Sequence, residues 1–146
     1  MSKLTDYISK NDETEIVDAI KAGEKQTSGE IRLHIEMKCP LEDPYDRALA
    51  VFEELNMHNT ELANGILLYI ALEDHKLVLC GDKGINEKVG QGFWESTVEI
   101  ITSHFKKNQY KEGLIKGITE VGQKLKEYFP YQSDDTNELK DDISKG

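Results

Sequence analysis

Seven oxygen-bearing side chains, several of them beside glycines, could together bind a divalent cation. The candidate ligands are five carboxylates and two amides: Glu30, Glu61, Asn64, Asp82, Asn86, Glu87 and Glu95. Calcium takes about 6–8 oxygen ligands from carboxylates, amides, carbonyls and water. Gly65, Gly81 and Gly84 would let two loops cross closely and turn carbonyl oxygens inward. The pattern favours calcium, with magnesium or manganese as alternatives, in a structural or regulatory role.

The same residues also have an ordinary interpretation. The 146-residue chain carries 18 Lys and Arg against 28 Asp and Glu, a formal net charge of −10, so acidic groups also arise as solvated surface. Asp82-Lys83-Gly84 is a common turn sequence. A second acidic group, formed by Glu42, Asp43 and Asp46, is expected near Asp74, and helix capping explains it sufficiently. The residues alone leave both interpretations open.

No signature of a catalytic nucleophile or of a cofactor site is visible. The four histidines lack HxH or HExxH spacing, and there is no GxSxG or GxxxxGK sequence. Cys39 and Cys80 lack a CxxC partner and are expected to be free thiols. We therefore assign no catalytic residue. The alternative to a cation-binding domain is a weak metal-dependent phosphatase acting on phosphomonoesters at the Asp82 edge.

Charge and hydropathy limit the classes of partner that we expect for this chain. An acidic chain without a basic patch argues against nucleic acid. The longest apolar run, 65–72, is far shorter than the roughly 20 residues of a membrane span, and residues 1–10 lack a signal-peptide core. We expect a cytoplasmic protein that inserts into no membrane and has an unidentified protein partner.

Hydrophobic periodicity predicts an α/β fold, a three-layer α/β/α sandwich around a small mixed sheet. Strict alternation over 30–38 predicts a half-exposed strand, and the two-sided apolar run 65–72 predicts a central one. A three-residue link to 76–81 fits only an antiparallel hairpin. Helices are expected over 12–27 and 44–55, from about 91, and from about 110 to Pro130.

This topology determines where the candidate ligands gather. A right-handed crossover through the 44–55 helix makes the 30–38 and 65–72 strands parallel, so both begin at one edge of the sheet. The hairpin returns the chain to that edge at Asp82. If the first two strands were antiparallel, Glu42 and Asp43 would take the place of Glu30. We expect one domain over 1–131 and an acidic, loosely ordered tail over 132–146.

Several stretches, spread over nearly the whole chain, resemble the TPM domain family. They are Thr27–Leu33 (TSGEIRL), Met57–Leu68 (MHNTELANGILL), Gly81–Ile85 (GDKGI), Phe93–Glu95 (FWE), Glu112–Leu114 (EGL), Phe129–Pro130 and Asn137–Leu139 (NEL). The family includes thylakoid-lumen proteins of photosystem II repair and many bacterial membrane-anchored proteins. The resemblance implies the α/β/α fold and a calcium or other divalent-cation site in loops at one sheet edge. For a plant member it also implies a weak acid phosphatase activity.

The chain departs from the family pattern in two ways. Ala63 stands where an arginine is common before the Asn-Gly pair, which argues against an anion-binding role for that loop. The signal peptide and membrane anchor frequent in the family are not seen, which predicts a stand-alone soluble member.

Overall fold

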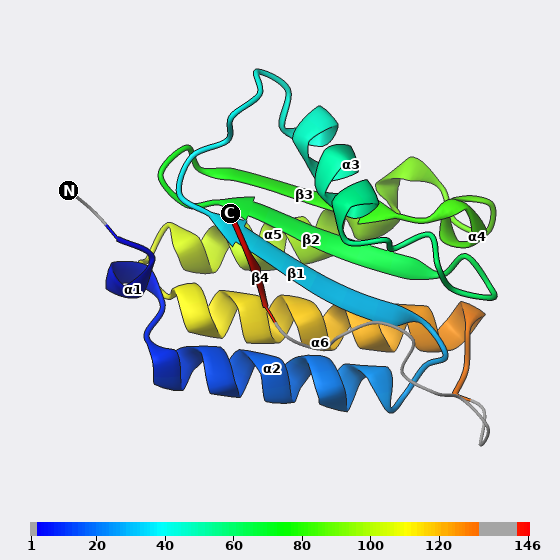
Figure 1. The fold of residues 1–146 in the computed structure, drawn as a ribbon. Helices are drawn as coiled ribbons and strands as arrows, with labels where there is room; N and C mark the ends of the chain where they lie inside the picture. The colour runs from blue at the N-terminus through cyan, green and yellow to red at the C-terminus, as the bar shows by residue number, and fades with distance from the viewer. Residues whose placement is uncertain (1–2, 132–142) are drawn as a thin grey trace.

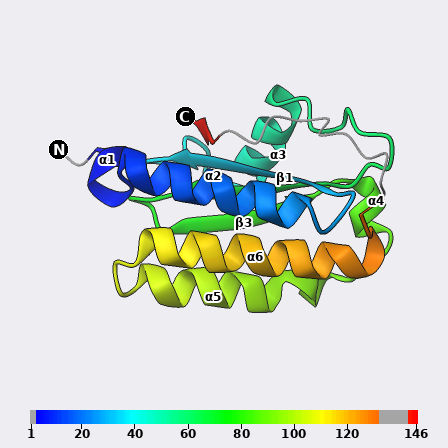
Figure 2. The same cartoon turned by 90° about the horizontal axis from the view of Figure 1, so that it is seen from below.

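The computed structural model describes residues 3–131 and 143–146, in which helices lie on both faces of a four-stranded sheet (Figure 1). The strands are β1 (Glu30–Glu36), β2 (Gly65–Ala71), β3 (Lys76–Gly81) and β4 (Ser144–Lys145). The principal helices are α2 (Lys10–Glu24), α3 (Pro44–Glu54), α5 (Glu95–Phe105) and α6 (Tyr110–Tyr128). The short helices are α1 (Leu4–Tyr7), α4 (Lys83–Asn86) and the 3₁₀ helix η1 (Gln91–Trp94). Helices α2, α5 and α6 cover one face and α3 the other (Figure 2), which confirms the α/β sandwich.

The sheet is mixed, with strand order β3-β2-β1-β4. β1 and β2 are parallel in the register Glu30 to Gly65, and β2 and β3 are antiparallel in the register Ile66 to Gly81. The parallel crossover and the hairpin are both as predicted. The beginnings of β1 and β2 and the end of β3 therefore lie at one edge of the sheet.

β2 is buried along its whole length, as its apolar sequence predicts. The interpretation of β1 as half-exposed is wrong. Three of its polar side chains, Glu30, His34 and Glu36, are at most 4% exposed. The alternation that indicated solvent instead marks a polar layer on the sheet face that carries α3 (Figure 2), and β4 pairs with the outer edge of β1.

A buried hydrogen-bond network pairs two members of this polar layer, Glu36 and His34. The guanidinium of Arg47 on α3 donates twice to the Glu36 carboxylate at 2.9 Å, and the Tyr69 hydroxyl also donates to it. His34 Nε2 lies 3.3 Å from Glu36, while His34 Nδ1 lies 2.9 Å from Ser144 Oγ on β4. A buried carboxylate is tolerated when it is fully paired in this way.

Glycines on α6 allow its two neighbouring helices to approach closely. A Cβ at Gly117 would lie 2.5 Å from Ile101 on α5, and a Cβ at Gly122 would lie 3.0 Å from the backbone of Gly23 on α2. The α6 backbone thus lies against the α2 backbone at Gly122 and against the Ile101 side chain of α5 at Gly117, which leaves little room for a larger residue at either position.

The helix ends differ from the periodicity-based expectations. Ser9 caps α2 in a reciprocal box with Asp12, so the helix begins before position 12. The buried face of α3 is formed by Ala48, Val51 and Phe52, whereas Tyr45 and Leu49 are 47% and 41% exposed.

The expected tail is described only in part, because 132–142 lie outside the described residues. Residues 143–146 dock against β1, with Ile143 buried in the core and Ser144 paired with His34. The sequence pattern contained no signal for this strand.

No helix within 3–131 is both long and apolar enough to cross a membrane.

Candidate functional site

Two loops cross at the sheet edge predicted to hold the candidate ligands. The Gly84 amide at the start of α4 donates to the Ala63 carbonyl at 2.7 Å. A Cβ at Gly84 would overlap the carbonyl oxygens of Leu62 and Ala63. Ala63 itself adopts φ 50°, a left-handed conformation that is unusual for alanine. The crossing therefore requires glycine on one side and a strained turn on the other.

Asp82 is the most buried carboxylate at this crossing, at 5% exposure. Its Oδ1 accepts a hydrogen bond from the Lys83 amide at 2.7 Å and lies 3.1 Å from His58 Nδ1. Its Oδ2 is also buried, and it has no hydrogen-bond partner within the described part of the chain. A buried carboxylate oxygen without a partner is costly, so Asp82 has unused capacity to bind a positive group.

A hollow of about 430 Å³ lies beside Asp82, between α3 and the β3–α4 turn. Its apolar wall is formed by Tyr45, Leu49 and Phe52 of α3. Its polar wall is formed by His58, Asp82, Lys83, Asn86 and Glu87. The hollow thus combines oxygen ligands with an exposed aromatic side chain.

Cys80 also lines this hollow but is not an activated nucleophile. Burial, together with the negative charge of Asp82, raises the pKa of the Cys80 thiol to about 11. It is therefore protonated at neutral pH, and thiolate chemistry is not supported here. Both cysteines are free, as predicted.

The structure brings together only part of the predicted ligand set. Asp82, Asn86 and Glu87 share the hollow. The Asp82 amide donates to the Gly65 carbonyl at 2.8 Å, and Gly65 pairs with Glu30 on its other side. Glu30 and Asp82 therefore flank Gly65 in one row of the sheet, with backbones about 10 Å apart.

The other predicted ligands lie apart from Asp82 or are engaged elsewhere. Asn64 is buried, and its amide nitrogen lies 3.5 Å from Ser28 Oγ. Glu61 is exposed in the loop. Glu95 lines a different groove, between β3 and α5. Among the described residues, no three His, Cys, Asp or Glu side chains gather closely enough to form a metal cluster.

Several residues that line the hollow were not chosen as ligands from the sequence. The sequence marks Lys83 only as part of a turn. The helical spacing of Tyr45 and Leu49 within 44–55 predicts one stripe of a helix, yet both side chains are exposed. For His58 the sequence leaves two interpretations open, a contributor to the loop site or an ordinary surface residue. In the structure it contacts Asp82 and packs edge-on against Phe52. Its position in the MHNTELANG segment was the available signal.

Ser144, His34 and Glu36 also form a hydrogen-bonded series that resembles a nucleophile, a base and an acid. The Glu36 charge is already neutralised by Arg47, and desolvation lowers the pKa of the buried His34. This arrangement favours a neutral, packed imidazole, and we assign the series a structural role.

Comparisons with known proteins agree with this fold. A family model described as TPM domain matches residues 1–124. The chain belongs to the TPM domain family. It is 47% identical to BA42 from the psychrophilic bacterium Bizionia argentinensis, with a TM-score of 0.91 and 100% of each chain covered.

The N-terminal domain of a protein from P. gingivalis shares the fold at 19% identity. Its TM-score is 0.70, and the match covers 88% of this chain and 84% of that one. A search of curated proteins found no match.

Proposed function

We propose that this chain binds a divalent cation of the calcium type at Asp82, and that the ion links the 56–64 loop to the 81–87 segment. The observation that carries the proposal is the buried Asp82 Oδ2, which lacks a hydrogen-bond partner among the described residues. Calcium would compensate its charge and accept water and neutral oxygens as further ligands.

The ligand set suits a weak site. Asn86 and Glu87 line the same hollow as Asp82, and the Ala63 carbonyl oxygen accepts a hydrogen bond from the Gly84 amide, two positions after Asp82. Calcium affinity depends on the number of charged ligands. With two carboxylates at most, we expect a Kd at the weak end of the range for calcium sites, about 10⁻⁴ to 10⁻³ M. Binding to the folded state alone would stabilise it by about 2.7 kcal/mol at 100 times the Kd.

A calcium titration of chelator-treated protein, followed by amide NMR, tests this proposal. We expect shifts confined to residues near 58–65 and 81–88. Asp82→Asn, which keeps the size of the side chain and removes its charge, should abolish them. Asp18→Asn, an exposed position on α2, is the matched control and should titrate like the wild type. A flat wild-type titration, or unchanged shifts in Asp82→Asn, would refute the site.

We further propose a regulatory or protein-interaction role rather than catalysis. Tyr45 and Leu49 are exposed apolar side chains on the wall opposite the acidic groups, and surfaces of this kind contact partners. Ordering of the loops by the cation would fix the shape of this wall. Amide hydrogen exchange of the 56–64 loop should therefore slow when calcium is added and stay unchanged in Asp82→Asn.

A metal-dependent phosphatase is the second candidate, and the name of the family model, TPM phosphatase, favours it. Lys83 and His58, which could contact a phosphoryl oxygen, line the hollow with Asp82. The activity predicts metal-dependent hydrolysis of p-nitrophenyl phosphate that is lost in Asp82→Asn. Hydrolysis that persists in this variant would come from another source.

A further inference from the structure

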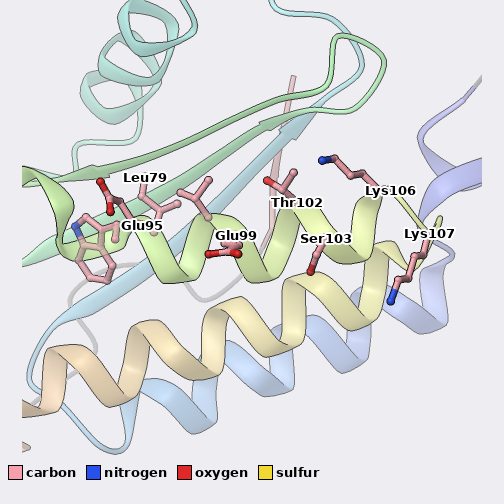
Figure 3. A pocket seen from close by; sticks show the side chains of 9 residues that line it. Leu79, Glu95, Glu99, Thr102, Ser103, Lys106 and Lys107 are labelled. Carbon is pink, nitrogen blue, oxygen red and sulfur yellow. The ribbon is translucent and has the colours of Figure 1, made fainter.

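A second open groove lies on the opposite face of the sheet from α3, between β3 and α5 (Figure 3). Its volume is about 740 Å³. Leu79 of β3, Trp94 and Val98 form its apolar floor, and Thr102 continues it along α5. Leu79 and Val98 are only partly covered, so the groove presents apolar surface that this chain does not bury.

The groove adjoins an edge of the sheet. β3 is the outermost strand, and within residues 3–131 and 143–146 no strand pairs with its outer side. An unpaired edge strand presents backbone N–H and C=O groups that can pair with a strand from another chain. Leu79 links the two features, because it lies on this edge strand and lines the groove.

The charges along this surface are ordered by position. Glu95 and Glu99 lie toward the N-terminal end of α5, whereas Lys106 and Lys107 lie just beyond its C-terminal end, and all four line the groove. Glu95 and Lys106 are eleven positions apart, about 16 Å along a helix. The surface is thus acidic at one end, basic at the other and apolar between them.

Such a surface complements itself. In a two-fold symmetric contact the same patch occurs on both copies in opposite directions. An axis that runs beside the middle of α5, perpendicular to the helix, would place Glu95 of each copy against Lys106 of the other. The same axis would set two β3 strands side by side in antiparallel orientation, and Val98 and Thr102 of both copies would meet at the centre.

We propose that the β3–α5 surface binds a second copy of this chain, forming a symmetric dimer with antiparallel β3 strands and paired α5 helices. This contact is independent of the Asp82 hollow, which lies on the other face of the sheet. The net charge of −10 per chain opposes association. The orientation of the two copies is determined by the local pairing of opposite charges.

Sedimentation velocity across a concentration series up to about 1 mM, where even weak contacts assemble, tests the dimer. The expected species has twice the 16.6 kDa chain mass. Each single variant, Glu95→Lys or Lys106→Glu, places like charges opposite one another at both symmetry-related contacts of the dimer. Each should raise the dimer Kd about tenfold. The double variant Glu95→Lys/Lys106→Glu restores the pairing with reversed signs and should recover the wild-type Kd.

Matched controls with the same charge changes are available on α6. Lys116 and Glu127 are exposed and lie outside the groove. Neither Lys116→Glu nor Glu127→Lys should alter the dimer Kd beyond the small effect of net charge. A chain that stays monomeric throughout, single variants that dimerise like the wild type, or a double variant that fails to recover would each overturn the proposal.

Discussion

The ion pair between Arg47 and Glu36 joins helix α3 to the sheet. Arg47 comes from α3 and Glu36 from β1, and their two hydrogen bonds are both 2.9 Å long. Burial alone would raise the pKa of Glu36, but hydrogen bonds from Arg47, Tyr69 and His34 lower it to about 2. The carboxylate is therefore charged at neutral pH and depends on its partners.

Removing Arg47 should be strongly destabilising. Arg47→Met keeps much of the side-chain volume but leaves the Glu36 charge buried and without its main partner, which costs about 3–5 kcal/mol. Arg47→Met/Glu36→Gln removes the charge as well and should recover part of this loss. Denaturant unfolding of the two single variants and the double variant measures the coupling. Strictly additive effects would mean that the two side chains do not act as a pair.

The loop crossing depends on a glycine that has no space for a side chain. Gly84→Ala would place a Cβ against the Leu62 and Ala63 carbonyls, so the two loops must separate. We expect a loss of at least about 1 kcal/mol and weaker cation binding in the NMR titration. Gly90→Ala is the matched control, because nothing lies within 4 Å of its Cβ and its φ is −84°. Equal stability of the two variants would contradict the crossing.

Strand β4 is the shortest strand, with two residues that pair with β1. It is anchored by Ile143, which is 7% exposed, and by the Gly146 amide, which donates to the Ile35 carbonyl. Ile143→Ala should release residues 143–146 from β1, since the apolar anchor supplies most of their docking energy. The Gly146 amide should then exchange rapidly with solvent. The exposed variant Lys126→Ala should leave this exchange unchanged.

The whole molecule should lose stability in two steps as pH falls. Desolvation lowers the pKa of His34 below 6.5, so the unfolded chain takes up a proton first and stability decreases as pH drops below 6.5. Glu36 has a lowered pKa of about 2 against 4.5. Its contribution is present above pH 4.5 and is lost between pH 4.5 and about 2.

Thermal unfolding measured between pH 8 and about 3 tests this order. His34→Gln should flatten the curve just below pH 6.5, because it removes a group whose pKa burial lowers in the folded state. His75→Asn is the control. His75 is exposed at φ 55°, a conformation that asparagine tolerates. An unchanged slope in His34→Gln would assign the pH dependence to other groups.

The sequence by itself determined most elements and their connections. The apolar run of β2, the polar link before β3 and the helical spacing after residue 110 are local patterns, and each correctly predicted its element. The parallel pairing of β1 and β2 followed from the handedness of the crossover. The meeting of Glu30, Gly65 and Asp82 at one edge was predictable for the same reason.

Only the tertiary structure decided which polar groups are covered. β1 alternates like a solvent-facing strand, yet α3 and β4 bury its polar face. Asp82 has the sequence context of an ordinary turn, yet the loop crossing buries its Oδ2. Glu95 comes soon after the Asp82 segment in the sequence, yet it lines the β3–α5 groove, on the opposite face of the sheet from the Asp82 hollow. Periodicity is a property of neighbouring residues, whereas burial depends on segments that are distant in the chain and pack together only in the folded state.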